Sequence, residues 1–165
     1  MFSYYQLSVP VYTRALTQLS HLLDKGVEFA LNKKVSDETM LGLRLAPDML
    51  PFVKQIQIVC DTAKFAVARL SGTEAPKHDD NEKTFAELKT RIDETLAFIE
   101  AIPEAAFADA GSKTIKLSFL PNPMSAEVYL LNFVAPNLYF HLTTAYAILR
   151  SNGVEVGKAD YLGAI

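Results

Sequence analysis

Four stretches of this chain carry apolar residues at the spacing of an amphipathic helix, and this pattern constrains the fold most strongly. Residues at i, i+3, i+4 and i+7 share one helical face, which is buried against its neighbours. Helices are predicted at about residues 4–32, 48–72, 84–103 and 125–152. Four such helices predict an all-α four-helix bundle. The four buried stripes are Tyr12, Leu16, Leu19, Leu23 and Ala30; Phe52, Ile56, Val59, Ala63, Val67 and Leu70; Phe85, Leu88, Ile92, Leu96 and Ile99; and Leu138, His141, Ala145 and Ile148.

Capping signals mark several of the predicted helix ends. Asp48 has the side chain of an N-cap residue, and Pro51 is tolerated in the opening turn that would follow it. Gly72 supplies the C-terminal stop of the same helix. Thr84 and Glu87 have the spacing of a capping box, so the third helix is expected to begin there.

The segments between the helices are expected to be short or irregular. Residues 35–46 look like a plain connector, and residues 103–123 like an irregular or hairpin insert between the third and fourth helices. Within that insert, residues 113–119 alternate polar and apolar side chains, which is typical of a hairpin arm. Pro10 and Pro136 are expected to bend the first and fourth helices.

Length and charge restrict the class of protein. The 165 residues predict one domain, 1–165. A net charge of −3, without a cluster of Lys and Arg, argues against a nucleic-acid partner. The single cysteine, Cys60, excludes an internal disulfide, and the first residues lack the pattern of a signal peptide. We therefore expect a cytoplasmic protein.

One segment calls for comparison with a membrane span. Residues 128–149 contain no Asp, Glu, Lys or Arg, and 22 residues are enough to cross a bilayer. However, the segment includes Asn132, Asn137 and His141, which hydrocarbon would penalise. A buried core helix is therefore predicted, without a membrane partner.

The fourth helix also carries the candidate site. His141 lies on its apolar stripe, and Asn137 lies one turn earlier on the same face. Gln55 falls within the stripe of the second helix, and buried polar groups need hydrogen-bond partners. We therefore expect His141, Asn137 and Gln55 to line a pocket between helices, together with Asp48 and the hydroxyl of Tyr146.

Other polar residues are expected to have ordinary structural roles. His21 lies off its apolar stripe, and His78 belongs to an acidic, solvated loop. Asp61 and Lys64 are spaced to form a surface ion pair one helical turn apart. Cys60 has no basic neighbour in the sequence and is expected to be a buried, inert thiol.

Several stretches together resemble a known family. They are Arg69-Leu-Ser-Gly72, His141 and Leu149-Arg-Ser-Asn-Gly153, with further stretches at 44–51, 61–64, 80–85, 136–150 and 157–163. The chain resembles the DinB/YfiT-like superfamily, and most closely its branch called domain of unknown function 1993. The run 136–150 is the most specific part of this resemblance.

The resemblance implies an up-down four-helix bundle, often a homodimer, with a site between helices. Characterised members of the superfamily include metal-dependent enzymes that act with low-molecular-weight thiols. Their ligands are one His on the second helix and a His-x-x-x-His pair on the fourth. His141 matches the second His of that pair, but Asn137 stands at the first, and residues 55–58 contain no His. No three-histidine centre is therefore predicted.

Three interpretations remain open. The first is a metal-free bundle whose pocket around His141 binds a small molecule, with no cofactor. The second is an enzyme with an altered site, a metal-dependent, thiol-dependent transferase or hydrolase-like protein. In it His141 acts either as a general acid or base, or as a ligand beside Asp48 or Gln55 for a divalent metal such as Zn or Ni. The third is a structural or stress-associated homodimer without chemistry.

Overall fold

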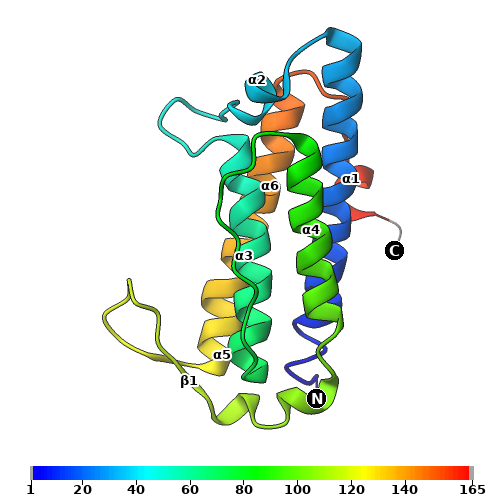
Figure 1. The fold of residues 1–165 in the computed structure, drawn as a ribbon. Coiled ribbons are helices and arrows are strands. Elements are labelled where there is room, and N and C mark those ends of the chain that lie inside the picture. Colours follow the sequence, from blue (N-terminus) through cyan, green and yellow to red (C-terminus); the bar gives the residue numbers. More distant parts are fainter. Residues whose placement is uncertain (1, 164–165) are drawn as a thin grey trace.

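Four long helices lie side by side in the computed structural model, which describes residues 2–163 (Figure 1). They are α1 (Val9–Lys33), α3 (Phe52–Ser71), α4 (Phe85–Glu100) and α6 (Ala135–Ser151). Helix α3 packs against α6 and α4, and α1 packs against α4, α3 and α6. Apart from one two-stranded sheet, the regular structure within residues 2–163 is helical, so the predicted all-α class is confirmed.

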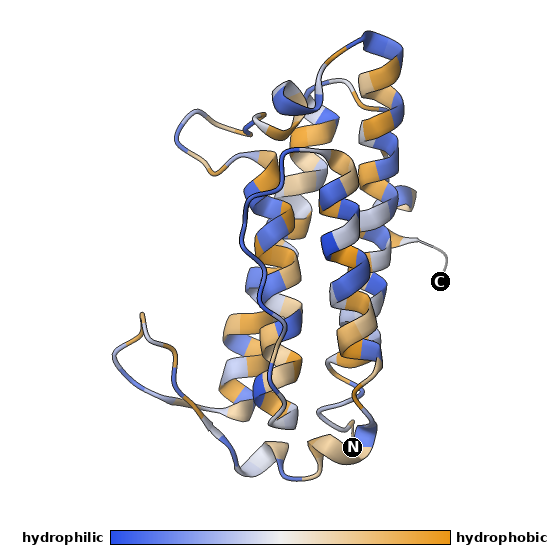
Figure 2. Cartoon of the chain, in the orientation of Figure 1, coloured by the Kyte–Doolittle hydropathy of each residue, from blue (hydrophilic) through white to orange (hydrophobic). Residues whose placement is uncertain are grey.

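The core is formed by the predicted stripes. On α6, Leu138, Ala145 and Ile148 are fully buried, as the spacing predicted. In Figure 2 the apolar residues of the long helices contrast with a hydrophilic segment, residues 73–83, which runs along the bundle. Among residues 2–163, every helix is too short or too polar to span a bilayer.

The order of helix directions differs from a simple up-down alternation. Helices α3 and α4 run in the same direction, because residues 73–83 return along the whole of α3 before α4 begins (Figure 1). Eleven extended residues span up to about 36 Å, which exceeds the roughly 30 Å of a 20-residue helix such as α3. We name residues 73–83 the crossover segment.

The predicted helix ends are partly correct. Thr84 and Glu87 form the expected capping box at the start of α4. The prediction for Asp48 is wrong: α3 begins at Phe52 with Pro51 as its N-cap, and Asp48 is exposed in the preceding loop. The reason is Pro51 itself, because a residue before proline is driven away from helical geometry. Pro10 lies in the first turn of α1, where a proline is tolerated without a bend.

The shorter segments contain more structure than expected. The connector 35–46 includes α2 (Asp37–Leu41), whose N-cap Ser36 accepts a hydrogen bond from the Thr39 amide. The insert 103–123 begins with two 3-10 turns, η1 (Glu104–Phe107) and η2 (Ala110–Ser112). Strand β1 (Thr114–Ile115) pairs antiparallel with β2 (Met124–Ser125), which confirms the predicted hairpin. A last helix, α7 (Lys158–Leu162), packs on α1.

The fourth long helix contains a π-helical interruption rather than a simple proline bend. It consists of α5 (Ala126–Val128), the π-helical segment η3 (Tyr129–Val134) and α6. Pro136 lacks an amide hydrogen, and its ring would collide with the carbonyl of Asn132 in a regular α-helix. The wider turns of η3 directly precede Pro136 and accommodate this conflict.

Arg91 of α4 holds the crossover segment against the bundle. Its side chain is 2% exposed, and its guanidinium lies 2.7 Å from the carboxylates of Asp61 and Asp80. Glu82 accepts a third bond at 2.8 Å and also receives one from the Gln57 amide at 2.7 Å. Burial alone would raise the pKa of Asp80 and Glu82, but hydrogen bonds from Arg91 lower both.

Lys64 and His78 extend this network, and their placement corrects two predictions. Lys64 pairs with Asp61 at 2.8 Å as predicted, but its side chain is 2% exposed, so this is not a surface pair. His78 is not solvated: its side chain is 8% exposed, and its Nδ1 accepts a bond from Lys64 Nζ at 2.9 Å. Its Nε2 faces Glu94 at 3.4 Å. The reason is that the crossover segment packs on the bundle, which sequence patterning did not reveal.

Replacing Arg91 by Met should destabilise the protein strongly. The change leaves three carboxylates without their shared cation, and breaking a buried ion pair in this way costs about 3–5 kcal/mol. Urea unfolding followed by circular dichroism measures the loss. The control is Lys77→Met in the same segment, where the side chain is 90% exposed and a change within about 0.5 kcal/mol is expected. Equal effects of the two substitutions would contradict the anchoring role.

Stability should fall as the pH drops from 7.5 to 5.5, in part through His78. Burial lowers the pKa of His78, and the nearby Lys64 and Arg91 lower it further. The unfolded chain, with an ordinary histidine pKa of about 6.5, therefore binds more protons in this range, so the free energy of unfolding decreases. His78→Gln keeps an acceptor for Lys64 but does not titrate, and should flatten the pH dependence.

The matched control for His78→Gln is Lys77→Gln, which makes the same change of residue type at the exposed neighbouring position of the crossover segment. Urea unfolding at several pH values should give it the wild-type slope. A wild-type slope in His78→Gln as well would show that His78 contributes nothing to the pH dependence.

Candidate functional site

The polar face between α3 and α6 brings His141 and Gln55 together. Gln55 is 1% exposed, and its Nε2 donates to the Leu50 carbonyl at 2.9 Å. This bond orients the amide so that its Oε1, 2.7 Å from His141 Nδ1, acts as the acceptor. His141 must then carry its proton on Nδ1, which leaves the lone pair of Nε2 available.

The electrostatic environment keeps His141 neutral. Burial lowers its pKa, and no charged neighbour shifts it in the opposite direction. At pH 7 the ring is therefore a neutral imidazole, and Gln55 fixes which nitrogen can accept a hydrogen bond or a proton. The ring of Phe140 packs edge-on against the imidazole, with 5.1 Å between the ring centroids.

Asn137 lies one turn earlier on α6 and contacts a different residue of α3. Its Nδ2 donates to Thr62 Oγ1 at 2.8 Å, two turns along α3 from Gln55. Helical spacing thus places both α6 side chains toward α3, but each has its own partner. Two polar contacts, Gln55–His141 and Thr62–Asn137, therefore lie between α3 and α6. We call these four residues the α3–α6 polar face.

The other residues predicted for the pocket lie elsewhere. Asp48 is exposed in the loop before α3, and Tyr146 packs edge-on against Tyr161 of α7 at 5.8 Å. Within residues 2–163, no hydrogen bond joins either of them to His141. Cys60 is buried in the core, where burial raises the pKa of its thiol to about 12 and keeps it protonated.

A cavity of about 190 Å³ adjoins the Asn137 end of the α3–α6 polar face. It lies among α3, the π-helical segment η3 and the hairpin, and its lining is aromatic with a few polar groups. Thr62 and Asn137 line it, whereas His141 and Gln55 lie beyond it. The remaining lining residues are Asp61, Phe65, Arg69, Leu117, Phe119, Tyr129 and Phe133.

Sequence reasoning missed most of this cavity. Arg69 belongs to a stretch that the resemblance singled out, but nothing in its spacing indicates a cavity. Tyr129 and Phe133 lie in a segment predicted as an ordinary α-helix, which is π-helical in the structure. Their rings stack with 6.0 Å between centroids and 14° between planes. Phe119 belongs to neither helix and lies in the loop of the hairpin, between β1 and β2.

The residues of the α3–α6 polar face do not fit a three-histidine metal centre. His141 offers one free imidazole nitrogen, Nε2, because Gln55 engages Nδ1, and the neighbouring positions offer amide and hydroxyl groups, which are poor first-row metal ligands beside imidazole. His21 instead contacts Asp160 at 2.9 Å, and His78 contacts Lys64. The described part of the chain contains no group of three or more His, Cys, Asp and Glu side chains arranged to hold a metal ion.

Comparison with known proteins identifies the family of this chain. Residues 4–162 match the family model described as domain of unknown function 1993. The chain belongs to this family. A crystal structure of a DinB family member from Shewanella denitrificans is 46% identical, with a TM-score of 0.93 over 98% of this chain and 92% of that one. This family member is therefore DinB-like, as its sequence predicted. No curated protein has a matching sequence.

Proposed function

We propose that this family member is a DinB-like bundle whose pocket between α3 and α6 binds a small molecule, without a three-histidine metal centre or another cofactor. One observation supports the proposal above others. A buried amide, Gln55, fixes the tautomer of a neutral histidine, His141, and leaves its Nε2 unprotonated, one helical turn from Asn137, which lines a ligand-sized cavity.

The chemistry of the α3–α6 polar face suits recognition of an uncharged polar group. A neutral imidazole Nε2 accepts a hydrogen bond from a ligand hydroxyl or amine. The carbonyl oxygen of the Asn137 side chain provides a second acceptor, since its amide nitrogen is the group that binds Thr62. Two acceptors about one helical turn apart favour a ligand with two donors, or one donor bridged by water.

Ligand binding should depend on His141. We expect fragments with hydroxyl or amine groups, screened by ¹H–¹⁵N NMR on protein without a histidine tag, to shift the signals of His141, Asn137 and Thr62. His141→Ala should weaken this binding at least ten-fold, since a buried polar contact is lost. The control His21→Ala, on α1 where the ring contacts Asp160 of α7, should leave it unchanged. Wild-type binding in His141→Ala would contradict the proposal.

We further propose that the protein forms a homodimer through the outer face of α6. Tyr139 and Phe140 are 44% and 56% exposed, and Pro136 and Thr143 continue the same exposed face. Aromatic residues at such exposure are typical of the centre of protein interfaces.

A dimer mass is expected in light scattering at micromolar concentration, and Phe140→Glu should convert it to the monomer, because a charge at the centre of the interface would be buried. Leu45→Glu is the control, since Leu45 is 44% exposed but lies in the loop before α3. A wild-type protein of monomer mass, or a dimer that survives Phe140→Glu, would refute this interface.

A further inference from the structure

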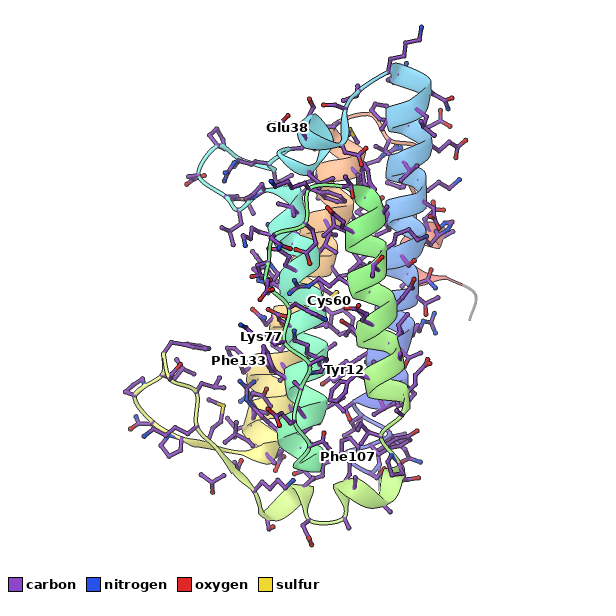
Figure 3. The ribbon with its side chains drawn as sticks, viewed as in Figure 1. Tyr12, Glu38, Cys60, Lys77, Phe107 and Phe133 are labelled. Carbon is purple, nitrogen blue, oxygen red and sulfur yellow. The ribbon has the colours of Figure 1, made fainter. Side chains whose placement is uncertain are left out.

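The cavity beside Asn137 has aromatic walls from three different elements. Phe65 belongs to α3, Phe119 to the hairpin, and Tyr129 and Phe133 to η3. Phe133 packs against Phe119 at 5.9 Å and stacks on Tyr129 at 6.0 Å. Figure 3 shows Phe133 on the yellow segment, between the hairpin loop and α3. Phe119 is 68% exposed, so this wall meets solvent.

Arg69 gives this aromatic cavity a positive charge. Its Nη1 donates to the Tyr129 hydroxyl at 2.8 Å, and its guanidinium lies 5.1 Å from the ring centre of Phe65 and 5.7 Å from that of Tyr129. Among residues 2–163, no carboxylate lies within 4 Å of it. A guanidinium has five N–H donors, and the one to Tyr129 is the side-chain bond that holds it in place.

Contacts other than an ion pair hold the Arg69 side chain in place, so no carboxylate neutralises its positive charge. It lies in the last turn of α3, where a cation interacts favourably with the helix dipole, and cation–π contacts hold its plane. Arg91, in contrast, has three carboxylate partners. A pre-positioned guanidinium with unused parallel donors matches the geometry of a carboxylate.

Asp61 also lines the cavity, and its charge is compensated elsewhere. Its carboxylate accepts bonds from Arg91 at 2.7 Å and from Lys64 at 2.8 Å. Among the residues that line the cavity, Arg69 is therefore the charged group with no oppositely charged partner within 4 Å. An unpaired guanidinium favours an anionic ligand.

The volume indicates the size of the group that fits within the cavity. A cavity of about 150 Å³ lined by apolar side chains holds one benzene ring, and this cavity measures about 190 Å³. It therefore has room for one ring and a small substituent. Aromatic walls favour a planar ring by stacked or edge-on contact.

We propose that this cavity binds a single-ring aromatic carboxylate, with its ring among Phe65, Phe119 and Phe133 and its carboxylate on Arg69. The inference rests on the proposed function, because Asn137 belongs to both the cavity and the α3–α6 polar face. It adds the class of ligand, and assigns Arg69 as the residue that selects for charge.

The test uses benzoate as the probe and benzamide as its uncharged equivalent, titrated into the full-length protein with ¹H–¹⁵N NMR detection. Benzoate should bind saturably and at least ten-fold more tightly than benzamide, since charge-assisted bonds are roughly twice as strong as neutral ones. Signals of Arg69, Phe119 and Phe133 should shift. Absence of saturable benzoate binding, or equal affinities for the two probes, would overturn the proposal.

Two variants locate the binding. Arg69→Met keeps an unbranched apolar stem and should weaken benzoate binding at least ten-fold while leaving benzamide within about two-fold. Arg150→Met, at an exposed arginine of α6, is the matched control and should bind benzoate like the wild type. If Arg69→Met fails to fold, Phe119→Ala, at an exposed hairpin position, should weaken both probes alike. Unchanged benzoate affinity in the folded Arg69→Met protein, or in Phe119→Ala, would overturn the assignment.

The proposed ligand class and the proposed function can be refuted separately. If fragments shift His141 but benzoate does not bind, the aromatic carboxylate is wrong and the proposed pocket stands. If benzoate binds through Arg69 and His141→Ala changes no ligand's affinity, the ligand class stands and the role of His141 is wrong.

Discussion

The buried guanidinium of Arg91 is the interaction on which the rest of the arrangement depends. It binds Asp61 of α3 and Asp80 and Glu82 of the crossover segment. These ion pairs fix the path by which residues 73–83 return along the bundle. Because that path is fixed, α4 starts at the same end as α3 and occupies one flank of it (Figure 1). The other flank of α3 is left for α6, and the α3–α6 polar face forms there. An interior cation with well-placed carboxylates of this kind specifies one arrangement of the chain more than it adds net stability.

The π-helical segment η3 is the second constraint, and it separates two functions along one helix. After Pro136, regular α-helical geometry aims Asn137 and His141 at α3. Before it, Tyr129 and Phe133 of the π-helical segment stack on each other, and the Tyr129 hydroxyl accepts a hydrogen bond from Arg69. A polar face and an aromatic cavity therefore adjoin at Asn137. Single π-helical turns within longer helices are frequently found at functional sites.

Local sequence patterns correctly predicted the features that depend on interactions between residues close in sequence. Apolar spacing placed Leu138 and Ile148 in the core, and the reciprocal bonds of Thr84 and Glu87 set the start of α4. The same spacing turned His141 toward α3, and the need of a buried amide for a partner indicated Gln55. Each of these inferences depends only on the geometry of a single helix or on the contact between two helices.

The features that the sequence did not reveal all depend on long-range packing. Arg91 lies between Leu88 and Ile92 in the sequence and looks like a surface residue, because its partners at positions 61, 80 and 82 converge only when the crossover segment folds back. His78 was misjudged for the same reason, since an acidic loop and an anchored crossover segment have the same composition. The cavity needs Phe119 from the hairpin, and no periodicity specifies how a hairpin packs on a helix.

Anomalous diffraction tests the central claim, that His141 works with an amide in a metal-free pocket, most directly. Crystals of the untagged protein, grown after expression with added zinc and nickel, would be measured at both absorption edges. The account predicts no anomalous peak at His141 and a hydrogen bond from its Nδ1 to Gln55. A zinc or nickel peak coordinated by His141 and two further side chains of the same protein would contradict it.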